Sequence, residues 1–222
     1  MIYTTGVVSL IVQCLIGIVD YLALNIEVDS KDELFKDLLR VEFFVQIIEF
    51  IFYVWLFSQF SRLSTNITLF RYLDWSITTP LMLITLSGFL NHDETRSIRL
   101  SEFLSSHTGS IVKIVLLNAA MLGCGLIGEL GHLSPYITTA LGFIPFALNF
   151  NYIKEKFLRD SEDKSKRAVF YWFVFFWSLY GVFAIMSHTT KNIGYNILDI
   201  FSKNVFGLIL AYILWSKSQE RK

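Results

Sequence analysis

The sequence predicts an all-α membrane protein, a bundle of seven transmembrane helices with its N-terminus outside. Two observations concern composition: 54% of the 222 residues are hydrophobic and only 17% are charged, whereas about a quarter of the residues of a soluble domain are charged. The third observation is how the charges are distributed. They gather in short clusters between apolar stretches of about 20 residues, the length that crosses a bilayer. Backbone groups cannot bond to water inside lipid, so each stretch is expected to be a helix.

Taken in order, the seven expected helices cover about 3–25, 38–60, 68–90, 110–131, 135–153, 167–188 and 193–215. Polar segments separate them at 27–37, 61–66, 91–107, 131–134, 154–167 and 188–192. The first stretch has no basic residues before it and is long enough to remain as a span, so a cleaved signal peptide is not expected. The charged run 27–40 also carries leucine and phenylalanine, which predicts an extension of the second helix along the inner surface. Without a linker or a repeat, residues 1–222 are expected to form one domain.

Lysine and arginine near the span ends predict the orientation, because they gather on the cytoplasmic side. With the N-terminus outside, the outer side holds only Arg62 and Lys191. The other lysines and arginines fall on the inner side, except Arg71 and Lys203, which lie within spans. The formal net charge is zero, which gives no reason to expect nucleic acid as a partner. Cys14 and Cys124 lie in apolar stretches and are interpreted as packing residues rather than a disulfide, and no metal-ligand spacing occurs.

Four charged residues lie near the middle of membrane spans: Arg71 and Asp74 in the third, and Asp199 and Lys203 in the seventh. A charge at the bilayer centre costs about 2.5–3.5 kcal/mol on insertion scales, so each one needs a partner. Asp199 and Lys203 are four residues apart and share one helix face. One interpretation is a structural cluster of ion pairs. The other is a reactive amine, since a buried lysine readily loses its proton and can form a Schiff base with an aldehyde, whose positive charge the two aspartates would balance.

Two motifs contain these charges. Residues 71–81 read RYLDWSITTPL, and residues 198–203 read LDIFSK. They resemble the RYxDWxxTTPL and LDxxxK motifs of the microbial (type 1) rhodopsins, in the same helices and the same order, and the likeness covers nearly the whole chain. The resemblance implies a seven-helix photoreceptor of the microbial rhodopsin type, not an enzyme, that carries all-trans retinal as a protonated Schiff base on Lys203.

The resemblance also implies roles for the residues around Lys203. Asp74 would be the primary counterion and proton acceptor, and Asp199 the second counterion. Arg71 would close the outer side of this complex, and Thr78 would form a hydrogen bond with Asp74.

Further residues would form the retinal pocket. Trp75 and Trp177 would enclose the polyene, and Thr79 would pair with Asn118. Tyr180 and Tyr53 would form hydrogen bonds with Asp199. Met121 and Gly125 would pack near the ionone ring, and Met82 is also implied at the chromophore. For each aromatic residue the alternative is ordinary packing in the core or against lipid.

Five positions depart from the family pattern. Gly181 and Ala184 replace a proline and a tryptophan, so the ring side of the pocket is expected to have a different shape. Thr85 stands where an outward proton pump carries a carboxylic acid, and a threonine cannot be a proton reservoir near neutral pH. Thr189 and Lys191 replace an outer pair of glutamates. An efficient pump cycle is therefore not expected.

The second helix carries an acid within its span. Glu49 lies one turn before Tyr53 on the same face, so it is expected to point into the bundle. Glu49, Asn204 (directly after Lys203) and Ser9 of the first helix together resemble the central gate of channelrhodopsins. In its short length the chain resembles the viral channelrhodopsins. A hydrogen-bonded plug of these three would block water in the dark, and carboxylates would favour cations. The alternative is structural, because a serine in a membrane helix often bonds only to its own backbone.

Two other acids, Asp20 and Glu129, are interpreted as solvated residues at helix ends, with the rim of a pore as the alternative. We therefore expect a light-gated cation channel, with a weak outward proton pump or a sensory rhodopsin as alternatives. The expected partners are the lipid bilayer, retinal, and transported cations or protons, with homo-oligomeric assembly as is common in the family. The expected location is integral, multi-pass, in the plasma membrane or an internal membrane.

Overall fold

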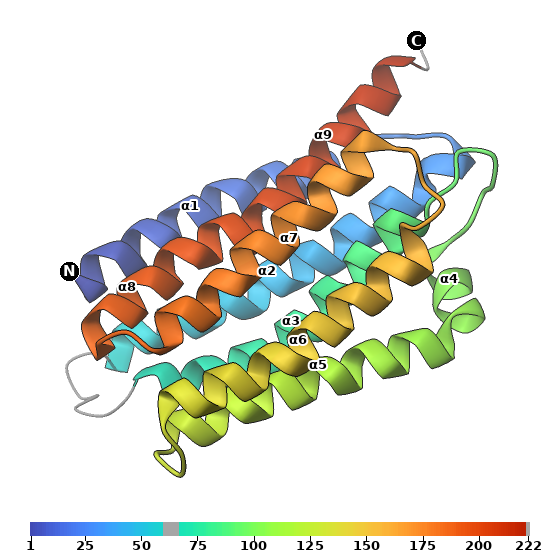
Figure 1. Cartoon of the computed structure of the whole chain (residues 1–222). Helices are drawn as coiled ribbons and strands as arrows, with labels where there is room; N and C mark the ends of the chain where they lie inside the picture. The colour runs from blue at the N-terminus through green and yellow to red at the C-terminus, as the bar shows by residue number, and fades with distance from the viewer. Residues whose placement is uncertain (60–66, 221–222) are drawn as a thin grey trace.

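The computed structural model describes residues 1–59 and 67–220, and every regular element in these ranges is helical. In chain order they are α1 (Ile2–Ala23), η1 (Ser30–Asp32), α2 (Glu33–Gln59), α3 (Ile67–Asn91), α4 (Leu100–Ser106), α5 (Thr108–Glu129), α6 (Pro135–Phe157), α7 (Lys164–Ala184), α8 (His188–Asp199), η2 (Ile200–Asn204) and α9 (Val205–Glu220). Figure 1 shows the long helices side by side, with residue 1 and the start of α8 at one end of the bundle and α4 and the last turns of α9 at the other. These are called the N-terminal end and the C-terminal end below.

The bundle contains the expected long helices, and the last of them, expected at about 193–215, is formed by α8, η2 and α9 end to end (Figure 1). Within the described ranges, six of these helices are long and apolar enough to cross a membrane, and α6 is not among them. With 23 residues α6 has the required length, but polar side chains such as Asn149 and Asn151 make it less apolar. It nevertheless packs against α5 and α7 within the same bundle.

The second helix begins at Glu33, within the charged run 27–40. Leu34, Leu38 and Leu39 are at most 1% exposed and pack into the bundle as part of α2. The expected extension of the second helix is present from Glu33 onward, but its leucines pack into the bundle instead of lying along a surface. Position 60, where this helix was expected to end, and the basic residues Arg62, Arg221 and Lys222 lie outside the described residues.

The connection 91–107 contains the short helix α4, which ion pairs attach to α2. The Arg99 guanidinium donates to the two carboxylate oxygens of Asp37 over 2.7 and 2.9 Å, and the Leu100 amide donates to the same carboxylate. Such a two-pronged contact fixes direction as well as distance. It holds α4 across the C-terminal end of the bundle.

An apolar core fills the C-terminal half of the bundle and includes the fully buried Leu38, Leu86, Phe103 and Leu210. At Gly88 of α3 an added Cβ would lie 2.9 Å from Leu38 Cδ2 of α2. The close approach of α2 and α3 therefore depends on this glycine. Because these two helices also carry Glu49 and Asp74, their packing sets the distance between the acids described next.

The outward faces of the helices are apolar, as expected for a chain dissolved in lipid. Ile11 and Leu15 of α1, Leu116 of α5 and Trp215 of α9 are each more than half exposed. Cys14 is exposed on the same side of α1, so it is not the packing residue that was expected, and both cysteines are free. The bilayer, rather than a protein core, is the environment of these side chains.

Candidate functional site

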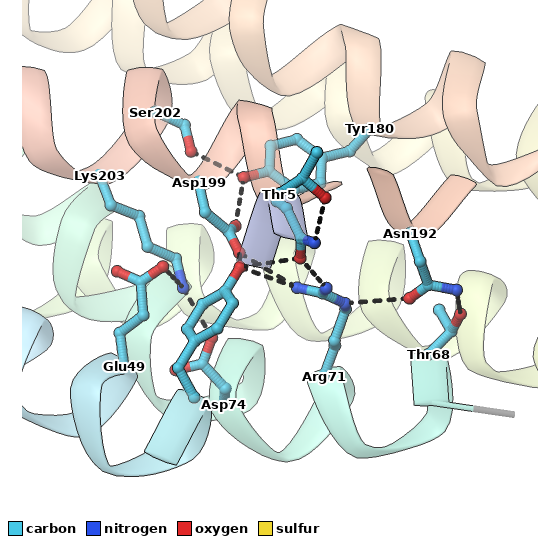
Figure 2. Close-up of polar contacts among 12 residues, drawn as sticks. Thr5, Glu49, Thr68, Arg71, Asp74, Tyr180, Asn192, Asp199, Ser202 and Lys203 are labelled. Atoms are coloured by element: carbon cyan, nitrogen blue, oxygen red, sulfur yellow. Dashed lines mark hydrogen bonds and ion pairs between the residues drawn. The ribbon is translucent and has the colours of Figure 1, made fainter. Parts of the chain in front are cut away.

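Lys203 lies in η2, a single π-helical turn between α8 and α9. Its Nζ is 2.6 Å from Asp74 Oδ2 of α3 and 3.5 Å from Glu49 Oε1 of α2 (Figure 2). The side chains of Lys203 and Glu49 are 2% and 0% exposed. Single π turns are frequent at functional sites, where they shift a side chain out of regular helical register. A buried amine thus stands between two carboxyl groups from different helices.

Asp199, one turn before Lys203, forms a second group of contacts. Its Oδ2 accepts hydrogen bonds from the Tyr53 hydroxyl at 2.6 Å and from Arg71 Nη1 at 3.1 Å, and its Oδ1 accepts from Tyr180 at 2.7 Å. Both tyrosine contacts agree with the expectation. The four charges expected within the spans therefore divide into two ion pairs, with Lys203 on one acid and Arg71 on the other.

Two asparagines that the sequence analysis did not single out complete this site. Asn192 and Asn196 both accept hydrogen bonds from the Arg71 guanidinium, Asn192 at 3.3 Å. They precede Asp199 by seven and three residues on the same helix face, and Lys203 follows four residues after it. That spacing was the signal available in the sequence, since an inward-facing row of polar residues in an apolar helix points to a shared site.

A cavity beside the Lys203 amine is lined by seven of the expected pocket residues: Trp75, Thr79, Met82, Met121, Gly125, Trp177 and Tyr180. Asp74, Thr78, Asn118 and Asp199 are not among its lining residues. Asp74 contacts the Lys203 amine, and Asn118 and Asp199 form hydrogen bonds with the lining residues Thr79 and Tyr180. Thr78 bonds to the backbone of Asp74. The structure adds aromatic lining residues that the sequence analysis did not name, including Tyr72 of α3, Phe143 and Phe146 of α6, and Tyr195 of α8.

Two of the positions at which the family pattern is replaced belong to the cavity. Gly181 and Ala184 both line it. An added Cβ at Gly181 would lie 2.7 Å from the ring of Phe143, which belongs to α6. A phenylalanine of α6 thus packs against the glycine that stands in place of the family's proline.

Two threonines of α3 form different bonds. Asn118 donates to the Thr79 hydroxyl at 2.8 Å, the pairing between helices that was expected. Thr78 forms the expected hydrogen bond with Asp74, and its acceptor is the Asp74 backbone carbonyl, at 2.9 Å. Hydroxyl groups within helices often bond to the preceding turn in this way. The Asp74 carboxyl is left facing Lys203.

The three expected gate residues, Ser9, Glu49 and Asn204, are each 0% exposed. Their side-chain oxygen and nitrogen atoms have no hydrogen-bond partner among the described residues. A directly bonded Ser–Glu–Asn plug is therefore not formed, and Glu49 faces Lys203 instead. The nearby Gln13 of α1 is also buried and unpartnered.

Two further buried pairs lie closer to the C-terminal end. Gln46 of α2 donates to Asp20 Oδ2 of α1 at 2.5 Å, and Thr85 of α3 forms a hydrogen bond with Glu42 of α2. Asp20 is 0% exposed, so its interpretation as a solvated helix-end residue is wrong. The reason is that α9 approaches α1 at Gly207, where an added Cβ would lie against Asp20 and Gln46.

At the N-terminal end, Glu129 of α5 forms an ion pair with Lys191 of α8. Both side chains are at most 10% exposed, so Glu129 is not a solvated residue either. Lys191, at a position where an outward proton pump carries a glutamate, is thus the cationic partner of a buried ion pair.

Comparison with known proteins gives one family. A sequence model described as "Bacteriorhodopsin-like protein" matches residues 2–217. Bacteriorhodopsin of Halobacterium salinarum is 27% identical over 156 residues, which cover 63% of this chain. The chain spans about half the length of that curated relative, 54%.

Solved structures are similar over nearly their whole length. Viral rhodopsin OLPVRII superposes with a TM-score of 0.82 at 26% identity, covering 97% of this chain and 98% of that one. The blue light-absorbing proteorhodopsin from Med12 gives 0.74 at 21% identity, covering 100% and 99%. Halorhodopsin, a light-driven chloride pump, gives 0.71 at 16% identity, covering 99% and 96%. At these last two identities the likeness concerns the fold alone.

Proposed function

Because the chain belongs to the family of bacteriorhodopsin-like proteins, the microbial rhodopsins, we propose that it carries retinal on Lys203 and acts as a light-gated cation channel. Membership makes the chain an integral, multi-pass membrane protein, a photoreceptor or transporter and not an enzyme, and it implies a retinal chromophore. The attachment residue, the ion and the mode of transport are argued below from the site.

The cavity has the chemistry that retinal requires. The Lys203 amine borders it, and rings and methionines such as Trp75, Trp177 and Met121 wall it, as suits an apolar conjugated chain. When bound, retinal supplies light absorption and a change of shape at the Lys203 nitrogen. Asp74 balances the charge on that nitrogen, and Tyr53 and Tyr180 hold Asp199 in place beside it.

One observation carries the channel proposal: between α1, α2 and the η2–α9 segment lies a series of buried polar atoms that have no hydrogen-bond partner within residues 1–59 and 67–220. Ser9, Gln13, Glu49 and Asn204 lie around the level of Lys203, and Gln46, Asp20 and Glu42 each contribute an unpartnered oxygen toward the C-terminal end. A buried polar atom without a partner costs about 1–3 kcal/mol. Water removes that cost, which favours a hydrated route along these helices.

The middle of this route contains the Lys203 site itself. The Lys203 nitrogen lies between Asp74 and Glu49 and so occupies the route. Displacing that nitrogen separates it from Glu49 and leaves a carboxyl group facing the path. The acids Glu49, Glu42 and Asp20 favour cations over anions, because a carboxylate-lined path attracts positive charge.

The test is voltage clamp of cells that express the chain with retinal supplied. A channel predicts photocurrents that change sign with membrane potential, with a reversal voltage that follows the cation gradient. Glu49→Gln should change the selectivity or the closing rate, and Lys203→Ala should abolish the current. Current that stays outward at every voltage would decide against the channel, and absence of current with a visible photocycle would favour a sensor.

A second candidate, an outward proton pump, is favoured by the contact between Thr85 and Glu42. Thr85 Oγ1 also lies 2.9 Å from the Met82 carbonyl, which can only accept a hydrogen bond. A hydroxyl has one proton, so a protonated Glu42 that donates to Thr85 satisfies both contacts. Glu42 would then supply the carboxylic acid that position 85 lacks. The reversal measurement above separates the two candidates.

A further inference from the structure

Asn196 of α8 uses both ends of its side-chain amide. Its Oδ1 accepts a hydrogen bond from Arg71 Nη2 and lies 3.2 Å from the Tyr53 hydroxyl, whose single proton is donated to Asp199. Its Nδ2 donates to the backbone carbonyl of Ile2 at 3.0 Å and to the Thr5 hydroxyl at 2.9 Å. The side chain, 2% exposed, therefore touches the counterion group on one side and the first turn of α1 on the other.

The orientation of this amide follows from the chemistry of its neighbours. The Arg71 guanidinium can only donate, so the oxygen must face it, and the Ile2 carbonyl can only accept, so the nitrogen must face α1. Neither contact survives a flip of the amide. Asn196 is thus a directional link between two elements that are far apart in the sequence.

The start of α1 fits closely against this link. At Gly6 an added Cβ would lie 2.5 Å from Phe57 Cζ and 3.3 Å from Asn196 Nδ2. Figure 2 shows Thr5 of α1 beside the same group of contacts as Arg71 and Asp199. A glycine at this position lets the first turn of α1 come within hydrogen-bond distance of α8.

Asn192, one turn earlier on α8, provides an internal comparison. It too accepts from Arg71, but its amide nitrogen donates to Thr68 of α3 and to the backbone of His188 in α8. Within the described ranges, the hydrogen bonds of Asn192 therefore stay on α3 and α8. Of the two asparagines, Asn196 is the one bonded to α1.

From this geometry we propose that Asn196 is a positioning residue that couples the first turn of α1 to the Arg71–Asp199 ion pair, so that the placement of α1 adjusts the counterions of the chromophore. The proposal rests on the proposed retinal function and deepens it. Arg71 is buried, and each of its acceptors limits how far the guanidinium can move from Asp199. If α1 moves away, Asn196 loses both of its hydrogen bonds to α1, Arg71 is held less firmly, and the carboxyl groups near Lys203 bind a proton more readily.

The first experiment is a pH titration of visible absorbance in the retinal-loaded protein. Acid protonates the counterions and shifts the absorption maximum to longer wavelength. Asn196→Leu should move the midpoint of this transition to higher pH by about one unit, a tenfold change in proton affinity. Thr5→Val, which alters only the α1 side of the link, should move it in the same direction by less. The matched control is Thr4→Val, because Thr4 is exposed, and its midpoint should equal that of the unaltered protein.

The decisive comparison is between the two threonine variants. If Thr5→Val and Thr4→Val give the same midpoint, α1 is not coupled to the counterions, and the proposal fails although the protein still binds retinal. An unchanged midpoint in Asn196→Leu would overturn it as well. Absence of visible absorbance in the unaltered protein would instead be a failure of the retinal function.

A second measurement does not need retinal, because coupling between two sites is reciprocal. In the protein without added retinal, Arg71→Gln should speed hydrogen exchange of the amides in the first turns of α1. Arg99→Gln, at the other end of the bundle, should leave that exchange unchanged. Equal exchange in the two variants would contradict the link from Asn196 to α1, whatever the colour of the loaded protein.

Discussion

The hydroxyl of Thr85 on α3 and the carboxyl of Glu42 on α2 form a hydrogen bond in which both side chains are at most 1% exposed. A position that looks inert in the sequence is thus paired with an acid from the neighbouring helix. The pair lies between the Lys203 site and the C-terminal end, so it stands on the path by which a proton or cation would reach Lys203 from that side.

Glu42→Gln should slow the return of a proton to the Lys203 nitrogen after a flash by about tenfold or more, as loss of a positioned acid commonly does. Flash photolysis of the retinal-loaded protein measures this rate. Thr85→Val is the matched control, since it removes the hydrogen bond and keeps the acid, and its effect should be smaller. Equal recovery rates in all three proteins would remove Glu42 from the proton path.

Lys203→Ala should abolish visible absorbance when retinal is supplied, because no other amine borders the cavity among the described residues. Absorbance spectra of the purified protein provide the measurement. Lys217→Ala, at the C-terminal end of α9, should keep the colour. A coloured Lys203→Ala protein would mean that the chromophore is attached elsewhere.

Asp74→Asn should move the absorption maximum to longer wavelength. The carboxylate lies 2.6 Å from Lys203 Nζ, and its loss leaves the positive charge on that nitrogen less stabilised. The spectrum is compared with that of Asp93→Asn, whose acid is exposed beyond the end of α3. An identical maximum in the two variants would exclude Asp74 as the primary counterion.

Gly207→Ala should lower the stability of the bundle by about 1–3 kcal/mol, the usual cost of overfilling a packed interior. The added Cβ would lie against Asp20 Oδ2 and Gln46 Nε2 and force their hydrogen bond apart. Thermal unfolding in detergent measures the change. Gly123→Ala is the control within a helix, because nothing lies within 4 Å of its added Cβ, and it should be neutral or slightly stabilising.

Acidification should loosen the C-terminal end of the bundle through His92, which lies just beyond α3. Burial lowers the pKa of its imidazole, although the Lys31 carbonyl opposes this by a hydrogen bond. The unfolded chain then binds the proton more readily, so stability is lost as the pH falls through about 6.5 toward the lower folded value. Tm should drop by a few degrees on acidification, and His92→Gln should reduce this drop. An equal drop in both proteins would exclude His92 as the cause.

The sequence determined the fold class, because apolar stretches of membrane length leave the backbone no alternative to helices. It also determined the Lys203 site, because charges in such stretches require partners, and the motifs at 71–81 and 198–203 fixed the helices that supply them. The hydrogen bonds from Tyr53 and Tyr180 to Asp199, and from Asn118 to Thr79, were implied only by the resemblance to the microbial rhodopsins.

What only the tertiary structure decided is which side chains of different helices face one another. The sequence assigned Glu49 to a plug with Ser9 and Asn204, whereas the packing of α2 against η2 turns it to Lys203. Asp20 became a buried partner of Gln46 because α9 approaches α1 at Gly207, and Asn196 reached the start of α1 because Gly6 leaves room. Periodicity along one helix fixes the face on which a residue lies, but the rotation and spacing of neighbouring helices follow from contacts among many side chains, which no single segment contains.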